Sequence, residues 1–158
     1  MPDDDLKVEI RGLVPTPTGV GVFLGAGSKT IAIFVDPHIG AAISLSLRKM
    51  KPPRPLTHDL IANIFAGLGA QVQKVVVNDL KDDTFFARLF LKQENELGRN
   101  ILEIDARPSD TFAIAVQHDC PIFVARSVWD KAQDMTWALE QAQAKEDQPE
   151  DDDAAPDA

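Results

Sequence analysis

The sequence of 158 residues predicts an α+β fold, a single compact domain of mostly antiparallel strands with about four helices. Segments with strand character follow one another in two groups, one before residue 36 and one between residues 71 and 106. Helical segments interrupt these groups irregularly and do not alternate with single strands, as they would in a doubly wound parallel sheet. The length is that of one ordinary domain, which can bury a core without disulfides or metal ions.

The N-terminal part of the chain predicts three strands, at residues 7–14, 20–24 and 30–35. Alternating apolar side chains mark the first strand, and a Gly-Ala-Gly segment at 25–27 joins the other two as a hairpin. The dipeptide Asp36–Pro37 then predicts a helix that continues to about Lys51, because Asp is a favourable N-cap residue and Pro is tolerated in the first turn.

A second helix is expected after the proline-rich segment 51–55, which cannot continue the first helix because each proline removes a hydrogen-bond donor. Thr57 is the expected N-cap residue, and Gly67 or Gly69 the expected end. One face of this helix is apolar at helical spacing, with Leu60, Ile61, Ile64, Phe65 and Leu68. Three strands follow, at residues 71–78, 84–92 and 100–106, with a turn at Asp82–Asp83 between the first two.

The C-terminal part predicts a third helix from Arg107–Pro108, a short strand at residues 121–125, and a last helix from Ser127 to about Ala144. After Lys145 the composition changes to acids, Pro and Ala, which cannot bury enough apolar surface to become ordered. We therefore expect a flexible acidic N-terminus at residues 1–5, a folded domain at 6–144 and a disordered acidic tail at 145–158.

The formal net charge of −9 belongs to the two ends of the chain. Residues 145–158 contain seven acids and one lysine, and residues 3–5 contribute three further acids. Residues 6–144 contain fifteen acids and fifteen Lys or Arg, so the body is neutral. A neutral body does not forbid a nucleic-acid partner, but it provides no general electrostatic attraction toward one.

The sequence also disfavours several locations and chemistries. Cys120 is the single cysteine, which excludes an intramolecular disulfide and suits a reducing cytosol. The acidic start is unlike a secretory signal, and no apolar run approaches the roughly 20 residues that span a bilayer, so we expect a cytoplasmic protein without a membrane partner. No phosphate-binding loop, nucleophile elbow or zinc-type His/Cys spacing is present, which argues against nucleotide-driven, acyl-transfer and redox chemistry.

Two polar clusters lie at expected helix starts. His58 and Asp59 follow Thr57 and are able to bind a metal or move a proton, or else they serve only as helix-start chemistry. The segment 105–110 places Asp105 and Asp110 beside Arg107, where the carboxylates could hold a divalent cation and the guanidinium a phosphate. The alternative is a capping network with an internal ion pair.

A basic cluster between the first two helices comprises Arg48, Lys49, Lys51 and Arg54. It could bind a phosphate backbone as a substrate-binding surface. The alternative is a set of solvated cations on a proline-rich surface turn.

Three motifs carry a family resemblance: PRPLTHDL at residues 53–60, DTFFARL at 83–89 and DARPSD at 105–110. In this order they closely resemble the bifunctional nuclease domain family, and the match runs from about residue 7 to about residue 125. Carried over by position, the shared polar residues of the family are His58, Asp59, Asp105, Arg107, Ser109 and Asp110. Family members usually have a glutamate on the first helix at the place of Ile39, where this sequence departs from the pattern.

The resemblance implies a metal-assisted nuclease that hydrolyses DNA or RNA. In that interpretation Asp105 and Asp110 bind Mg²⁺ or Mn²⁺, and His58, oriented by Asp59, acts as general base or acid. Arg107 then stabilises charge on the phosphate, Ser109 completes the catalytic group, and no organic cofactor is expected. The alternative is a non-enzymatic dimeric binding or regulatory module, because the family is similar in fold to small domains that self-associate as homodimers.

Overall fold

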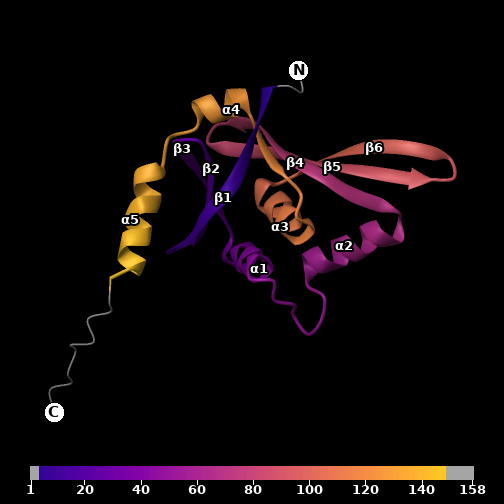
Figure 1. The fold of residues 1–158 in the computed structure, drawn as a ribbon, viewed down its shortest axis with the longest axis horizontal. Coiled ribbons are helices and arrows are strands. Elements are labelled where there is room, and N and C mark those ends of the chain that lie inside the picture. The colour runs from indigo at the N-terminus through magenta and orange to yellow at the C-terminus, as the bar shows by residue number, and fades with distance from the viewer. Residues whose placement is uncertain (1–3, 149–158) are drawn as a thin grey trace, which may run out of the picture.

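A seven-stranded mixed sheet organises the protein, whose computed structural model describes residues 4–148. The strands lie in the order β3-β2-β1-β7-β4-β5-β6, and within the described residues only β4 and β7 pair in parallel (Figure 1). Their bounds are β1 (Asp5–Thr16), β2 (Gly19–Ala26), β3 (Lys29–Val35), β4 (Ala70–Lys81), β5 (Thr84–Asn95), β6 (Gly98–Ala106) and β7 (Ile122–Ala125). The predicted α+β class and mostly antiparallel pairing are confirmed, and every predicted strand is present.

The described residues form five helices: α1 (Pro37–Leu47), α2 (Thr57–Gly67), α3 (Pro108–His118), α4 (Arg126–Lys131) and α5 (Thr136–Glu146). The prediction of one continuous last helix is wrong, because the chain leaves the helix at Ala132 and starts another at Thr136. Asp134 accepts hydrogen bonds from both the backbone N and the hydroxyl of Thr136. Met135 N donates to the carbonyl of Thr30 on β3, so tertiary pairing fixes the break.

The core lies between the sheet and the helices α1 and α3, which run together in the centre of the molecule (Figure 1). Phe112 on α3 is fully buried and is the largest fully buried side chain among the described residues. Gly40 lets α1 approach β2 closely, since a Cβ there would collide with the side chain of Val20. Ile39, where the resemblance leads us to expect a glutamate, is a core residue 9% exposed. This packing fixes the start of α3 against the rest of the fold.

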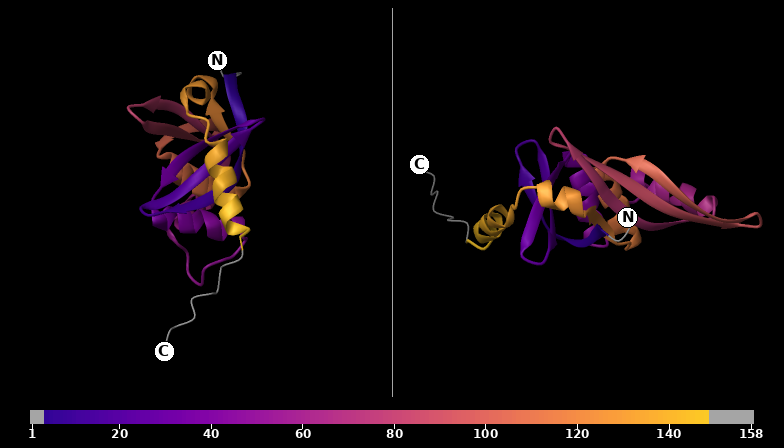
Figure 2. Two further views of the ribbon diagram at one scale, coloured as in Figure 1. Left: turned by 90° about the vertical axis from the view of Figure 1, so that its left-hand side faces the viewer. Right: turned by 90° about the horizontal axis from the view of Figure 1, so that it is seen from above.

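The β5–β6 hairpin projects away from the helical layer (Figures 1 and 2). At the β4–β5 turn Asp82 and Asp83 both have positive φ, 49° and 62°, which is the backbone geometry of a two-residue hairpin loop and confirms the predicted turn. Except for half-buried Ala106, every residue of β6 is exposed. An edge strand with this much uncovered surface is open to pairing with another chain.

The predicted apolar face of α2 is only half used. Ile61 and Phe65 pack against the core, whereas Leu60, Ile64 and Leu68 remain 54%, 50% and 61% exposed. The helix covers the sheet with one flank and presents the other flank to the surroundings. The sequence pattern alone could not distinguish an apolar face buried in this fold from one left open.

The ends of the described chain lie close to the predicted boundaries. β1 already begins at Asp5, and α5 continues to Glu146. Most of the predicted acidic tail, residues 149–158, lies outside the described residues. None of the helices found between residues 4 and 148 is both long enough and apolar enough to cross a membrane.

Candidate functional site

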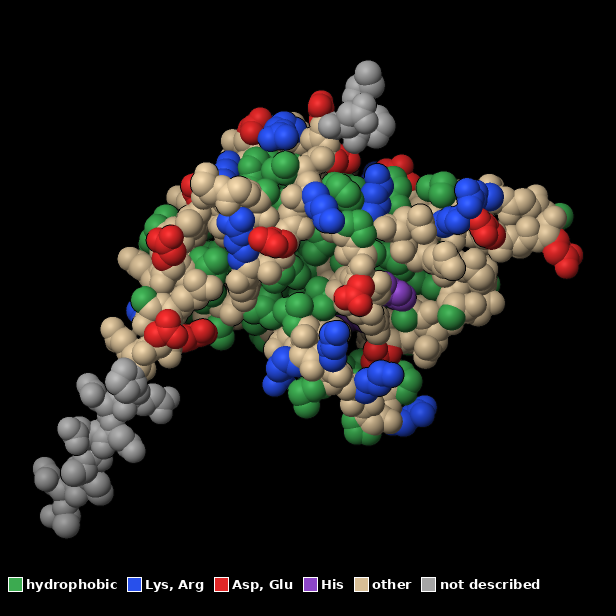
Figure 3. Space-filling model, in the orientation of Figure 1, with side chains coloured by type: hydrophobic (Ala, Val, Ile, Leu, Met, Phe, Trp, Pro, Cys, Tyr) green, Lys and Arg blue, Asp and Glu red, His purple; other side chains and the backbone are tan. Residues whose placement is uncertain are grey.

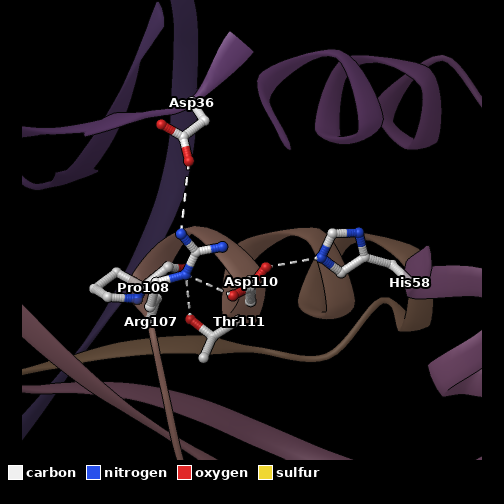
Figure 4. A network of polar contacts seen from close by, with 6 residues as sticks. All are labelled: Asp36, His58, Arg107, Pro108, Asp110 and Thr111. Carbon is white, nitrogen blue, oxygen red and sulfur yellow. Dashed lines mark hydrogen bonds and ion pairs between the residues drawn. The ribbon is translucent and has the colours of Figure 1, made fainter. Parts of the chain in front are cut away.

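The starts of α2 and α3 meet, although they are more than fifty residues apart in sequence. His58 Nε2 lies 3.0 Å from Asp110 Oδ1, and the His58 side chain is only 13% exposed (Figure 4). The packing of α2 against α3 creates this contact, because each residue is in the first turn of its helix. The structure thus brings one residue of each polar cluster into direct contact.

Arg107 continues the network on the other side of Asp110. Its Nε donates to Asp110 Oδ2 at 2.9 Å, and its Nη1 lies 3.5 Å from Asp36 Oδ2 (Figure 4). The second contact joins two side chains that are 63% and 67% exposed, so it adds little stability. The result is a chain of contacts from Asp36 through Arg107 and Asp110 to His58.

Asp110 is held as a carboxylate. Burial by itself would raise its pKa, but hydrogen bonds from Arg107 and His58 outweigh burial and hold the pKa below its usual value. An ionised carboxylate can only accept hydrogen bonds, so His58 Nε2 must carry the proton that it donates. The other ring nitrogen, Nδ1, is turned away from Asp110 (Figure 4).

Asp59 takes the helix-start role that the sequence left open, and it does not orient His58 as the resemblance implies. Its Oδ2 accepts a hydrogen bond from Leu56 N at 2.8 Å, and its Oδ1 accepts one from Gln117 Nε2 at 2.5 Å. His58 is therefore oriented by Asp110 and not by Asp59. Thr57 is also not the N-cap residue, since the helix begins at Thr57 with Leu56 in the cap position and Asp59 bonding back to it.

A cleft of about 490 Å³ opens between α1, α2 and α3. His58, Asp59 and Gln117 line it from the two helix faces just described, and Lys49 and Lys51 line it from the α1–α2 segment. Basic side chains gather over that segment at the lower edge of the molecule in Figure 3. Of the predicted basic cluster, Arg48 and Arg54 do not line the cleft. The structure thus joins two predicted lysines to the predicted His58 site.

The backbone at Lys49 has φ 55°, a left-handed conformation that is unfavourable for a residue with a side chain. It follows the end of α1, where the Lys49 N donates to Ser46 O at 3.0 Å. Glycine is the usual residue at such a position.

A second hollow, of about 360 Å³, lies on the far side of the Arg107 contact. Asp83, Thr84 and Phe85 of the DTFFARL motif line it together with Arg107 and Ser109. Ser109 is 8% exposed and lies in the first turn of α3. The three motifs that carry the family resemblance therefore converge around the start of α3.

Asp105 is exposed on β6 and lies opposite Arg88 of β5. Both oxygens of Asp110, its predicted partner in metal binding, already accept hydrogen bonds. Between residues 4 and 148, no group of three or more His, Cys, Asp or Glu side chains lies close enough together to hold a metal ion. The described residues thus offer a divalent cation no ready-made set of ligands.

Two residues of the site were missed from the sequence. Asp36 was interpreted as a helix cap, but its side chain makes no capping hydrogen bond and faces Arg107. Gln117 was not considered, although it lies seven residues after Asp110 on the same helix. Seven residues are almost two full turns, so this spacing places Asp110 and Gln117 on one face of the helix and could have revealed Gln117 as a site residue.

Comparison with known proteins agrees with this convergence of motifs. An uncharacterized protein of Mycobacterium tuberculosis (strain H37Rv) is 40% identical over 106 residues, which cover 67% of this chain and 60% of that protein. Bifunctional nuclease 1 of Oryza sativa subsp. japonica is 30% identical over 84 residues, 52% of this chain and 25% of that protein. The matched part of the chain therefore covers 60% of the mycobacterial protein and 25% of the rice protein, less than two thirds of either. The model of the bifunctional nuclease domain matches residues 22–136. This chain therefore belongs to the bifunctional nuclease domain family.

Proposed function

We propose that this protein hydrolyses phosphodiester bonds of DNA or RNA in the cleft between α1, α2 and α3. The observation that carries the proposal is the contact of His58 with Asp110, at the wall of a cleft that Lys49 and Lys51 also line. A positioned histidine beside cations is the minimum needed to move a proton at a bound phosphate. The family membership and the names of the rice relatives support the same reaction class.

In the proposed reaction His58 Nδ1 accepts the proton of the attacking water or hydroxyl, whose oxygen forms a new bond to phosphorus. The bond from phosphorus to the leaving oxygen breaks, and the imidazolium returns its proton to that oxygen. Asp110, bonded to Nε2, fixes the tautomer and stabilises the imidazolium that forms. Lys49 and Lys51 hold the phosphate in the cleft. Arg107 acts through Asp110, and Ser109 stays a candidate at the second hollow.

A divalent cation, Mg²⁺ or Mn²⁺, is implied by the resemblance but does not fit the described residues as they lie. Asp105 is exposed, and a cation at Asp110 would have to displace Arg107 or His58. We therefore assign no step to a metal ion. The effect of Mg²⁺, Mn²⁺ and EDTA is measured directly in the assay below.

The test compares purified wild type with His58→Ala and Asp110→Asn on single-stranded DNA and RNA, with each ion and with EDTA. His38→Ala is the matched control, because His38 is exposed on α1 and does not line the cleft. We expect His58→Ala to lower cleavage by about 100-fold or more, Asp110→Asn to lower it as well, and His38→Ala to leave it unchanged. Cleavage that survives both site substitutions comes from a contaminating nuclease or another site and contradicts the proposal.

A second candidate function, a non-enzymatic dimeric binding module, is favoured by a separate observation. The uncovered flank of α2 exposes Leu60, Ile64 and Leu68, and the β5–β6 hairpin exposes Leu97 and Ile101. Exposed apolar side chains gathered on one element are typical of protein–protein contacts. We propose a homodimer through this surface, which is compatible with either function.

A further inference from the structure

We infer that the second hollow, between β3, the β4–β5 turn and the start of α3, binds an unstacked guanine base. The choice of a nucleotide as ligand rests on the proposed function, and guanine deepens that function by naming the base beside the phosphate. Arg107 lines this hollow and His58 lines the cleft, and Asp110 contacts both of them (Figure 4). A nucleotide that places its base in the hollow therefore has its phosphate near His58.

An exposed aromatic ring gives the hollow a surface on which a base can stack. Phe34, near the end of β3, lines the hollow and is 65% exposed. Its register partner on β2 is Gly21, where a Cβ would lie 3.3 Å from the ring atom Cε1, so the glycine leaves room for the ring beside it. Phe85 also lines the hollow and packs against the core. Proteins that bind unpaired bases stack them on aromatic rings of this kind.

A carboxylate in the hollow selects among the bases. Asp83 is exposed there and makes no hydrogen bond or ion pair with another residue in the described part of the chain. A carboxylate only accepts hydrogen bonds. Guanine presents two neighbouring donors, N1–H and the N2 amino group. Adenine and cytosine present one amino group beside an accepting ring nitrogen, and uracil presents one N–H between two carbonyl groups. Of the four bases, guanine alone can donate twice to the Asp83 carboxylate.

The hollow also supplies donors for the accepting edge of guanine. Arg107 uses Nε for Asp110 and Nη1 for Asp36, and its Nη2 contacts neither carboxylate (Figure 4). Ser109, only 8% exposed, and Thr84 line the hollow as well, and neither hydroxyl is hydrogen-bonded to another of the residues 4–148. Contact of a guanidinium with O6 and N7 is a frequent way to recognise guanine.

The charges of the hollow suit an uncharged base better than a phosphate. Three charged side chains line it, the carboxylates of Asp36 and Asp83 and the guanidinium of Arg107. The excess of negative charge repels a phosphate, so the phosphate of the nucleotide stays outside the hollow. A cationic amine could approach the carboxylates, but it has no acceptor for Arg107 Nη2 and no flat ring for Phe34.

The experiment measures binding without turnover, by titration calorimetry of the full chain with GMP, IMP and AMP. All three carry the same ribose and phosphate. IMP keeps N1–H and O6 but lacks the N2 amino group, and AMP lacks the pair of donors altogether. We expect GMP to bind about tenfold more tightly than IMP, the effect of one hydrogen bond to a charged acceptor, and AMP to bind no better than IMP. Equal affinities for GMP and IMP overturn the inference.

Asp83→Gly removes the carboxylate and keeps the turn, because φ is 62° at this position and glycine favours such a backbone. Asp82→Gly is the matched control, since Asp82 is exposed in the same turn with φ 49° and does not line the hollow. We expect the first variant to bind GMP and IMP equally and the second to keep the wild-type preference. A preference for GMP that survives Asp83→Gly contradicts the assigned acceptor.

Phe34→Ala removes the stacking surface. Its matched control is Phe86→Ala, because Phe86 is 41% exposed on β5 and does not line the hollow. We expect Phe34→Ala to weaken GMP binding at least about fivefold and Phe86→Ala to leave it unchanged. Unchanged GMP binding by Phe34→Ala contradicts base stacking in the hollow. If Phe34→Ala does not fold, the wild-type comparison and Asp83→Gly still decide.

The two proposals fail in different ways. Selective GMP binding by a protein that does not cleave nucleic acid supports the guanine site and contradicts the nuclease function. Cleavage by a protein that binds GMP and IMP equally supports the nuclease function and contradicts the guanine site.

Discussion

Asp110 connects the two halves of the site at the scale of single residues. One carboxylate oxygen accepts from His58 and the other from Arg107, so its charge serves both neighbours. Removing the charge leaves two donors without their acceptor. We therefore expect substitution of Asp110 to change the stability of the protein as well as its activity.

The pKa of Asp110 is lower in the folded protein than its usual value, which gives a sign to the pH dependence. The contribution of Asp110 to stability is complete above the unfolded-state pKa of about 3.9. It is lost as the pH falls through the folded-state pKa, where the carboxylate becomes protonated. We expect Asp110→Asn to lower the free energy of unfolding by about 1 kcal/mol at pH 5.5 and by less at pH 3, which lies below the unfolded-state pKa.

Urea unfolding of both proteins at the two pH values checks this. The control is Asp130→Asn, an exposed carboxylate on α4 away from the site. A gap between wild type and Asp110→Asn that stays constant down to pH 3 would show that the carboxylate charge does not stabilise the fold.

Some contacts of the candidate site were predictable from the sequence and others were not. The sequence placed polar clusters at two helix starts, and the resemblance implied that His58 and Asp110 act in one site, where the structure shows them in contact. The partners within the cluster were not predictable, because they depend on how α2 is rotated against α3. With the helices in this rotation, His58 is hydrogen-bonded to Asp110 and Gln117 to Asp59.

At the scale of elements, hydrophobic periodicity predicted the position of nearly every helix and strand. It did not predict which other elements pack against them. The β4–β5 hairpin was predictable because Asp82–Asp83 is local turn chemistry. The break between α4 and α5 was not, since it depends on a hydrogen bond from Met135 to Thr30, about one hundred residues earlier. The open flank of α2 is a third case, in which an apolar face fits a core and an interface equally well.

The open flank of α2 and the uncovered edge strand β6 together lead to a prediction about assembly. Antiparallel pairing of β6 with a second copy of itself would bring Arg99 near the acids Glu103 and Asp105 of the other chain, which favours the contact. We expect a dimer in solution, and we expect Leu60→Gln together with Ile64→Gln to raise its dissociation constant at least tenfold. Sedimentation velocity over a concentration series measures this.

Trp137→Gln serves as the control, because Trp137 is 55% exposed on α5, outside the proposed surface. The double substitution should leave the melting temperature of the monomer nearly unchanged, since both side chains are about half exposed already. A wild type that remains monomeric at about 100 μM, a weak-binding concentration, rules out the proposed contact.

At the scale of the whole molecule, charge is distributed unevenly for a protein proposed to bind a polyanion. The neutral body places two lysines at the cleft, whereas residues 149–158 carry five acids and no basic residue. An acidic segment joined to the chain competes with nucleic acid for the same cations and repels the incoming phosphates. Nucleic-acid binding should therefore be limited by a part of the chain remote from the site in sequence.

Truncation after Gln148 tests this, because it changes the formal charge from −9 to −4 and leaves α5 complete. We expect the truncated protein to bind single-stranded DNA or RNA several-fold more tightly at about 20 mM salt, and the gain to disappear near 0.5 M, where charges are screened within a few ångströms. The melting temperature should not change, since the prediction from composition is that this segment adds nothing to folding.

A full-length variant in which the five acids become Asn or Gln separates charge from length, and it should bind like the truncated protein. If both variants bind like wild type at low salt, the acidic segment does not compete for the cleft. A large loss of melting temperature on truncation would instead show that residues 149–158 help to hold the fold together.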